Sequence, residues 1–340
     1  MKILVGISGG VDSAVTTYLL KEQGYEVVGL YMKMHSGVNH KENLEKIERL
    51  SRLIGFEYHV EDVEEEFKKE VYDYFVKSYE EGATPNPCAM CNREIKFGIF
   101  MSFLEKYGCE KAATGHYIRN DGKFLYEAKD KTKDQSYFLF GIKKEVLPKV
   151  LFPLGDYTKD EIKNIAKKIG LEEFASQKES QDICFIDTNY IDVLKFHYNP
   201  EKPGKVVDKR GRKIGTHKGY SFYTIGQRKG FRLFKSHKPQ YVIGIDSKTN
   251  TLIVGDKEDL AKTQVFLKGV NLFIDEKIFE CESKVRYRAP KLPAVVKMET
   301  KSKAVVKFKD PAIGVAKGQA CVFYDGEKLL GGGWIRGAKR

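Results

Sequence analysis

The segment Lys2-Ile3-Leu4-Val5-Gly6-Ile7-Ser8-Gly9-Gly10-Val11-Asp12-Ser13 decides the fold of this chain. Its apolar first half predicts a strand over residues 2–7, and the residues that follow predict a helix over 13–23. The two adjacent glycines between them allow a tight turn that points several backbone N–H groups at one anion. The helix adds the positive end of its dipole at the same place. The segment therefore predicts a phosphate site at a strand-to-helix turn.

Three side chains of this loop can take part directly. Ser8 and Ser13 can donate hydroxyl groups, and Asp12 can cap the helix or help to hold Mg²⁺. The loop is not a Walker A motif, because the lysine of that motif is missing. The alternative is a plain glycine-rich turn, but the full Ser-Gly-Gly-Val-Asp-Ser string directly after a first strand favours phosphate binding.

The rest of the first half continues the alternation of strands and helices. Further strands are predicted over 26–32, 57–63 and 110–114, and further helices over 41–54, 64–80 and 93–107. This order is typical of an α/β domain with a doubly wound parallel sheet. Ligands of such sheets bind at the carboxyl ends of the strands, where the phosphate loop also lies.

The second half changes character after about residue 190. Short segments separated by glycine turns predict strands over 240–245, 251–255, 265–271, 282–289, 293–299, 303–309, 320–324 and 328–335. Such a succession is typical of a small β-barrel or sandwich. We therefore expect three domains, an α/β domain over 1–190, a small central domain over 191–262 and a C-terminal β-barrel over 263–340.

Charge is divided unevenly between the two halves. The net charge is +12, with 27 Lys and Arg against 32 Asp and Glu in residues 1–190, and 32 against 15 in residues 191–340. A half this basic is expected to face a polyanion such as nucleic acid, rather than to serve solubility alone. The sequence has no run of about 20 apolar residues and no signal peptide, which predicts a cytoplasmic protein without a membrane span. The default expectation for the oligomeric state is a monomer.

Three of the six cysteines carry a chemical signal. Cys88 and Cys91 form a CxxC pair in a proline-rich loop, which predicts metal or redox chemistry in a long cytoplasmic chain. Cys184 lies far away in the sequence and would have to be brought to this pair by the fold. The remaining cysteines, in apolar or strand-like segments, are expected to be inert buried thiols: Cys109, Cys281 and Cys321.

Further motifs follow the phosphate loop along the chain. They are Leu30–Lys33, Thr84–Asn92, Ala113–Tyr117, Lys133–Leu139, Asp182–Ile186, Tyr223–Arg228 and Val285–Arg288. In this order they resemble the tRNA-specific 2-thiouridylases (MnmA, also called TrmU) over nearly the whole chain. The resemblance implies a PP-loop domain that cleaves ATP between its α and β phosphates, followed by a central domain and a C-terminal β-barrel that bind tRNA. It also implies 2-thiolation of the wobble uridine in the tRNAs for Lys, Glu and Gln.

The resemblance further implies roles for individual residues. The expected ATP contacts are Gly6, Ile7, Ser8, Gly9, Gly10, Val11, Asp12, Ser13, Met32 and Gly115. The expected contacts with the target base or the rest of the tRNA are Asn86, Pro87, Cys88, His116, Lys133, Asp134, Gln135, Tyr287, Arg288 and Gln319. Met32 would otherwise be strand core and His116 a surface histidine. Two arginines flanking Tyr287 on a predicted strand favour phosphate contact and base stacking over a merely solvated face.

The expected reaction needs ATP because the uridine 2-oxygen is a poor leaving group. Attack of this oxygen on the α-phosphate releases pyrophosphate, and the loop with bound Mg²⁺ stabilises the charge on the transferring group. By the resemblance, Cys91 is the nucleophile and Cys184 carries a persulfide that a cysteine desulfurase relay supplies. The pair then closes a disulfide, which a reductant must reset.

Cys88 leaves a second sulfur chemistry open. Many members of the family have Asp at this position, where it is interpreted as a base or an orienting group. With Cys there, the thiolates of Cys88, Cys91 and Cys184 could hold a [4Fe–4S] cluster that leaves one iron open to sulfide. A zinc site is less expected, since no fourth ligand is evident nearby.

Three other functions remain as alternatives at this point. An amidating ligase or small-molecule adenylating synthetase would share the phosphate loop but would need neither the basic half nor paired cysteines. A non-catalytic RNA-binding protein with a vestigial loop would explain the charge but not the CxxC pair. A thiolase that acts at another tRNA position through a three-cysteine cluster would use the same loop and the same cysteines.

Overall fold

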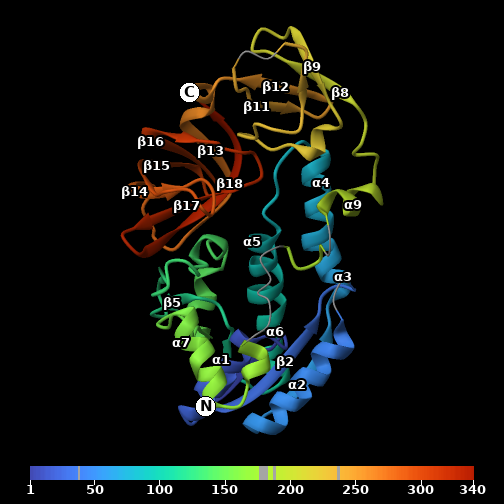
Figure 1. The fold of residues 1–340 in the computed structure, drawn as a ribbon. Coiled ribbons are helices and arrows are strands. Elements are labelled where there is room, and N and C mark those ends of the chain that lie inside the picture. Colours follow the sequence, from blue (N-terminus) through green and yellow to red (C-terminus); the bar gives the residue numbers. More distant parts are fainter. Residues whose placement is uncertain (37–38, 176–182, 187–188, 236–237) are drawn as a thin grey trace. The chain divides into compact units, whose positions relative to one another are not determined.

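The computed structural model describes residues 1–340 except 37–38, 176–182, 187–188 and 236–237 (Figure 1). The chain divides into two compact units. The first contains residues 1–71, 88–187 and 326–330, and the second contains residues 72–87, 188–325 and 331–340. No helix among the described residues is both long enough and apolar enough to cross a membrane.

The first unit is built around a five-stranded, wholly parallel sheet of order β3-β2-β1-β4-β7. These strands are β1 (Lys2–Gly6), β2 (Glu26–Lys33), β3 (Glu57–Asp62), β4 (Lys111–Ala113) and β7 (Val150–Leu151). A hairpin of β5 (Ile118–Asn120) and β6 (Leu125–Glu127) pairs with residues 328–329 of the same unit. The predicted doubly wound parallel sheet is thereby confirmed.

The first unit also contains helices. They are α1 (Val11–Glu22), α2 (His40–Ile54), α3 (Glu64–Phe67), α5 (Pro87–Cys91), α6 (Phe100–Lys106), α7 (Lys159–Lys168) and α8 (Glu172–Ala175). Two π-helical segments, η1 (Lys68–Tyr72) and η2 (Asn92–Ile99), and two 3₁₀ turns, η3 (Ser136–Phe138) and η4 (Lys144–Lys149), complete the set. Apolar residues of α1, α2 and α7 share one core with strand residues such as Ile3 and Val5, each 0% exposed.

The acidic helix predicted over 64–80 is helical throughout, but it is not α-helical over its whole length. The segment is α3, then the π-helical η1, then α4 (Asp73–Glu80). The buried side chains Phe67, Val71 and Phe75 recur every four residues, whereas an α-helix turns every 3.6 residues. The wider π-helical turn of η1 lies between the two α-helical parts of this segment.

The second unit contains α4, α9 (Tyr190–Lys195) and two sheets. The smaller sheet has the order β10-β9-β8-β12-β11, with β8 (Gly204–Val207), β9 (Lys213–His217), β10 (Arg232–Leu233), β11 (Tyr241–Asp246) and β12 (Thr251–Gly255). It is accompanied by the 3₁₀ turns η5 (Tyr220–Phe222) and η6 (Lys257–Leu260). The sequence pattern predicted β11 and β12 but not β8, β9 and β10, which are short and rich in Lys and Arg.

The larger sheet closes into a six-stranded barrel of order β13-β16-β15-β14-β17-β18, because β13 also pairs with β18. Its strands are β13 (Ala261–Leu272), β14 (Ile278–Lys284), β15 (Leu292–Thr300), β16 (Lys303–Ile313), β17 (Ala320–Asp325) and β18 (Lys328–Lys339). The predicted C-terminal β-barrel is confirmed, but the strand predicted over 282–289 is wrong in its second half. The chain leaves β14 at Lys284 and turns, and Ala289 N donates to Arg286 O at 3.1 Å.

Candidate active site

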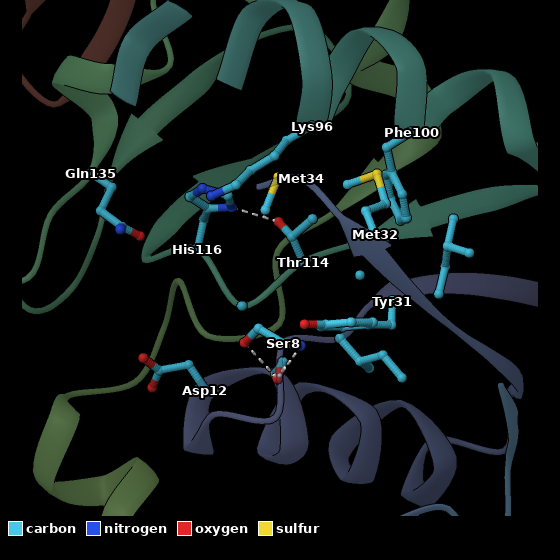
Figure 2. Close-up of a pocket in the computed structure, with 15 residues that line it drawn as sticks. Ser8, Asp12, Tyr31, Met32, Met34, Lys96, Phe100, Thr114, His116 and Gln135 are labelled. Carbon is cyan, nitrogen blue, oxygen red and sulfur yellow. Dashed lines mark hydrogen bonds between the residues drawn. The ribbon is translucent and has the colours of Figure 1, made fainter. Parts of the chain in front are cut away.

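A cavity of about 250 Å³ lies in the first unit at the carboxyl ends of β1, β2 and β4 (Figure 2). Its lining residues are Gly6, Ile7, Ser8, Asp12, Ser13, Leu30, Tyr31, Met32, Met34, Lys96, Phe100, Thr114, Gly115, His116 and Gln135. Seven of the residues expected to bind ATP therefore line one cavity, namely Gly6, Ile7, Ser8, Asp12, Ser13, Met32 and Gly115. Gly9, Gly10 and Val11 belong to the same loop without lining the cavity.

Hydrogen bonds within the phosphate loop set its shape. Ser8 N donates to Ser13 Oγ at 3.2 Å, and Ser13 Oγ donates to Gly10 O at 3.0 Å. Gly9 has a φ of +78°, which residues with a side chain rarely adopt. Because Gly10 is the N-cap of α1 and has no capping side chain, the first N–H groups of this helix are left for a ligand.

Asp12 has a different role from the cap suggested by the sequence. It lies inside the first turn of α1, and its Oδ1 accepts hydrogen bonds from the Tyr117 hydroxyl at 2.7 Å and from Lys159 Nζ at 2.7 Å. Lys159 Nζ also donates to Asp12 Oδ2 at 2.9 Å. The carboxylate is therefore neutralised by a buried lysine, and a Mg²⁺ ion at Asp12 would compete with that lysine.

Gly115 allows the segment after β4 to lie directly on the phosphate loop. A Cβ atom at this position would lie 2.9 Å from the carbonyl carbon of Asp12 and 3.1 Å from its oxygen. Both are backbone atoms of α1, so they cannot swing aside. A glycine is required here for close approach rather than for an unusual backbone angle.

His116 is buried in the cavity wall and is held by two hydrogen bonds. Its Nδ1 lies 2.8 Å from Thr114 Oγ1, and its Nε2 lies 3.2 Å from Asn92 Oδ1. Asn92 Nδ2 donates to Phe138 O at 3.2 Å, which turns Oδ1 toward the histidine and makes Nε2 the donor. Burial, and secondarily the Lys96 ammonium, hold the pKa of His116 well below its usual value. The imidazole is therefore neutral at pH 7.

The three cysteines singled out from the sequence lie in the same unit and interact. Cys88 and Cys91 are on α5, with Cys91 buried and Cys88 exposed, and Cys184 is exposed in a turn over residues 183–186. Desolvation raises the pKa of all three thiols, and that of Cys91 to about 12, while the Lys96 ammonium acts in the opposite direction on each. The charge of Cys184 also raises the pKa of both Cys88 and Cys91. The Lys96 ammonium therefore acts electrostatically on all three thiols.

Aromatic packing anchors the turn that carries Cys184. Phe185 is 8% exposed, and its ring meets those of Phe67 and His35 edge-on, at centroid distances of 5.6 and 6.2 Å. Asp182, the first residue of the predicted motif around Cys184, lies outside the described residues.

The described residues contain no group of three or more His, Cys, Asp or Glu side chains placed to hold a metal ion. The cysteines expected as ligands of a [4Fe–4S] cluster, Cys88, Cys91 and Cys184, are near one another without forming such a cage. In this arrangement they do not fit a preformed cluster.

The expected tRNA contacts of the first unit differ in exposure. Asp134 is buried, and its Oδ1 and Oδ2 accept hydrogen bonds from Ala128 N at 2.9 Å and Ser136 Oγ at 2.6 Å. Gln135 lines the cavity, and its Oε1 accepts from Tyr117 N at 2.9 Å. Lys133 is half-buried at the same turn. Asp134 therefore stabilises the turn that carries Lys133 and Gln135.

In the second unit, Gln319 organises the segment that precedes the CxxC pair. Its Nε2 donates to the carbonyl oxygens of Thr84 at 3.1 Å and Pro85 at 2.9 Å. Asn86 and Pro87 are buried, and Asn86 N donates to the hydroxyl of Tyr74 at 3.4 Å. This segment is therefore held in one conformation by the unit that contains the barrel.

Tyr287 and Arg288 lie in the turn after β14, and not on a strand face as the sequence suggested. Arg288 is exposed and Tyr287 half-buried. The ammonium of Lys284 lies 6.0 Å from the centroid of the Tyr287 ring.

Sequence reasoning missed Lys96, Tyr117 and Lys159. Lys159 and Tyr117 form hydrogen bonds with Asp12 although they are 147 and 105 residues away in the sequence. No local sequence pattern could predict these two contacts. Lys96 follows Cys91 by five residues on one helical segment, and α-helical geometry would place the two side chains on different sides, so this spacing did not point to it.

Comparisons with known proteins cover nearly the whole chain. The tRNA methyl transferase HUP domain matches residues 1–188, the tRNA methyl transferase PRC-barrel domain matches 191–256, and the aminomethyltransferase beta-barrel domain matches 261–335. Proteins named tRNA-specific 2-thiouridylase MnmA are similar throughout. That of a Nitratiruptor species is 55% identical, over 98% of this chain and 99% of its own length. That of Campylobacter curvus is 51% identical, over 99% of this chain and 100% of its own.

Proposed function

The chain belongs to the family of tRNA-specific 2-thiouridylases, MnmA, and on this premise we propose that it replaces the 2-oxygen of the wobble uridine of tRNA by sulfur, with consumption of ATP. The observation that carries the proposal is that one unit holds both a phosphate-loop cavity and three thiols, and that Lys96 lines this cavity while its charge acts on each thiol. Membership of this family argues against two of the alternatives, an amidating or adenylating synthetase and a non-catalytic RNA-binding protein with a vestigial loop. It does not favour a thiolase for another tRNA position.

The first step activates the uridine. ATP binds with its phosphates at the amino end of α1, where Ser8, Ser13 and the free N–H groups of the loop are the donors. The uridine 2-oxygen attacks the α-phosphorus, the bond to the β-phosphate breaks, and its electron pair leaves with pyrophosphate. Mg²⁺ bound with ATP would neutralise part of the phosphate charge. The 2-oxygen is then attached to AMP, which is a good leaving group.

The second step transfers sulfur. The terminal sulfur of a Cys184 persulfide attacks carbon 2, and the carbon–oxygen bond breaks with its electron pair leaving on AMP. The Cys91 thiolate then attacks the Sγ of Cys184, which releases the new thiocarbonyl and forms a Cys91–Cys184 disulfide. A thiol reductant returns two electrons to this disulfide before the next cycle. The persulfide itself would come from a cysteine desulfurase relay.

The buried thiol of Cys91 is mostly protonated at neutral pH. Because burial raises the pKa of Cys91 to about 12, only a small fraction is thiolate at neutral pH, and the thiolate is the reactive form. A change that exposes the Cys91 thiol or brings it closer to a positive charge must therefore precede attack.

The remaining assignments follow the family. Asn86, Pro87 and Cys88 would meet the target base, since Gln319 fixes the segment that carries them. His116, Lys133, Asp134, Gln135, Tyr287, Arg288 and Gln319 would position the tRNA of the Lys, Glu or Gln type, with Asp134 acting through its turn. The proposed domains remain 1–190, 191–262 and 263–340, the last two for tRNA.

The test is a reconstituted reaction with purified protein, ATP, Mg²⁺, unmodified tRNA and a persulfide donor. Mass spectrometry of the digested tRNA should detect 2-thiouridine, and the Cys91→Ala and Cys184→Ala variants should each lose it. Cys109→Ala, which removes a buried thiol remote from the proposed chemistry, is the matched control and should keep the activity. Near-normal turnover of either active-site variant would refute the role given to that cysteine.

A second experiment distinguishes the persulfide scheme from a [4Fe–4S] cluster by testing whether activity depends on bound iron. The protein is purified without oxygen, reconstituted with iron and sulfide, and compared with iron-free protein at equal concentration. The persulfide scheme expects full activity of the iron-free protein with a persulfide donor. Activity that depends on bound iron, and on Cys88 as well as Cys91 and Cys184, would favour a [4Fe–4S] cluster.

A further inference from the structure

Lys96 is placed between the nucleotide cavity and the cysteines. Its side chain lines the cavity on the side opposite the phosphate loop, and Figure 2 shows it beside His116 and facing Ser8 and Asp12 across the opening. It is the lysine whose charge acts on Cys88, Cys91 and Cys184 together. Within the described residues it forms no ion pair with an acidic side chain, so its charge is available to a ligand.

The π-helical form of η2 determines this position. In an α-helix, five residues correspond to a rotation of about 500°, which would place Lys96 about 140° away from Cys91 around the axis. A π-helix instead joins residues five apart in one turn. Cys91 immediately precedes η2 and Lys96 is its fifth residue, so the two side chains lie toward the same side.

The surroundings of Lys96 suit an anion rather than a second cation. His116 is neutral because of burial, and both of its ring nitrogens are engaged by Thr114 and Asn92. Asp12, the acidic residue of the cavity lining, is already paired with Lys159. Lys96 is therefore the uncompensated positive side chain of this cavity, facing the loop whose N–H groups also attract negative charge.

We propose that Lys96 is a catalytic residue that binds the α-phosphate from the side opposite the phosphate loop. This rests on the proposed function. As the uridine oxygen attacks, negative charge builds up on the α-phosphate oxygens, and Lys96 stabilises it. When sulfur later attacks carbon 2, the same ammonium stabilises the charge that returns to AMP. Interactions made more strongly in these transition states than with bound ATP raise kcat rather than affinity.

The test compares Lys96→Met, Lys96→Gln and Lys96→Arg with the wild type and with Lys168→Met. Lys168 is an exposed lysine in the last turn of α7 and serves as the control for loss of one positive charge. The assay measures pyrophosphate released in the presence of tRNA, at saturating ATP and tRNA, together with 2-thiouridine by mass spectrometry. Melting temperatures check folding, and Lys96→Gln gives the comparison if the Met variant is unstable.

The expected result is a fall of about 100-fold in kcat for pyrophosphate release in the neutral variants, with a much smaller change in KM for ATP. Lys96→Arg should recover part of this loss, since it keeps the charge but not the geometry. An unchanged kcat, or a rise in KM for tRNA alone, would overturn the assignment. A wild-type protein that forms no 2-thiouridine would instead refute the proposed function.

Discussion

Gly115→Ala tests whether the segment after β4 closes the nucleotide site by direct contact with the phosphate loop. The added methyl group would lie 2.9 Å from the carbonyl carbon of Asp12, whereas ordinary contacts of a Cβ begin at 3.4 Å. The backbone must therefore move apart by about half an ångström, and overpacking of this kind costs about 1–3 kcal/mol. If the displacement is taken up by the loop, ATP affinity falls about 5- to 150-fold.

Calorimetric titration with a non-hydrolysable ATP analogue measures this affinity directly, and thermal unfolding measures the part of the cost taken from stability. Gly337→Ala is the matched control, because no atom lies within 4 Å of the position of its Cβ. It should change neither quantity. Gly115→Ala protein with wild-type affinity and wild-type melting temperature would show that the loop does not depend on this close approach.

Three further predictions concern the Asp12 ion pair, the buried thiol and the segment before the CxxC pair. Lys159→Met leaves the Asp12 carboxylate without its cation and should lower the free energy of unfolding by about 1–3 kcal/mol, since Asp12 is partly exposed; Asp12→Asn in the same chain should restore most of it in urea unfolding. Cys91 keeps its proton up to a pKa of about 12 in the folded protein, whereas an unfolded thiol ionises near about 8.5. Burial of the protonated thiol therefore stabilises the folded protein below about pH 8.5, and this contribution is lost as the pH rises toward 12. Between pH 7 and pH 10 the free energy of unfolding should fall more for wild type than for Cys91→Ala. Equal falls in the two proteins would contradict the burial of this thiol. Gln319→Ala removes two hydrogen bonds to the segment 84–87 and should lower the rate of tRNA thiolation while ATP-analogue affinity stays unchanged; a loss of nucleotide affinity would contradict the separation of these roles.

Local patterns were sufficient to predict the framework of the site. An apolar strand, two glycines and a helix predict β1, the phosphate loop and α1 because each depends on neighbours in the sequence. The C-terminal barrel was predictable for the same reason, since turns and alternating strands follow one another over residues 261–339. The small strands between 204 and 233 escaped prediction because they contain few apolar residues, of which Val206 and Val207 are buried.

The electrostatics of the site depend on contacts that are distant in sequence. Asp12 looks like a cap or a metal ligand in isolation, and only its pairing with Lys159 shows that its charge is already compensated. His116 looks like a surface residue, but Asn92 and Thr114 hold it buried and neutral. No propensity or spacing rule predicts such pairs, because they are created by the packing of separate elements.

Departures from α-helical geometry were equally invisible in the sequence. Both π-helical segments were predicted as ordinary helix, since a period of 3.6 and a wider turn differ by less than one residue. At η2 the difference is consequential, because it determines on which side of the helix Lys96 lies relative to Cys91. A helical-wheel argument alone would have placed this lysine away from the cysteines.

The central claim is that the uridine 2-oxygen leaves attached to AMP, and following this oxygen tests it most directly. A tRNA substrate that carries ¹⁸O at the 2-position of the wobble uridine is incubated with the protein, ATP and a persulfide donor for one turnover. Mass spectrometry should find ¹⁸O in the phosphate of AMP, in an amount equal to the 2-thiouridine formed. Recovery of the label in water or pyrophosphate, with 2-thiouridine still produced, would contradict the account.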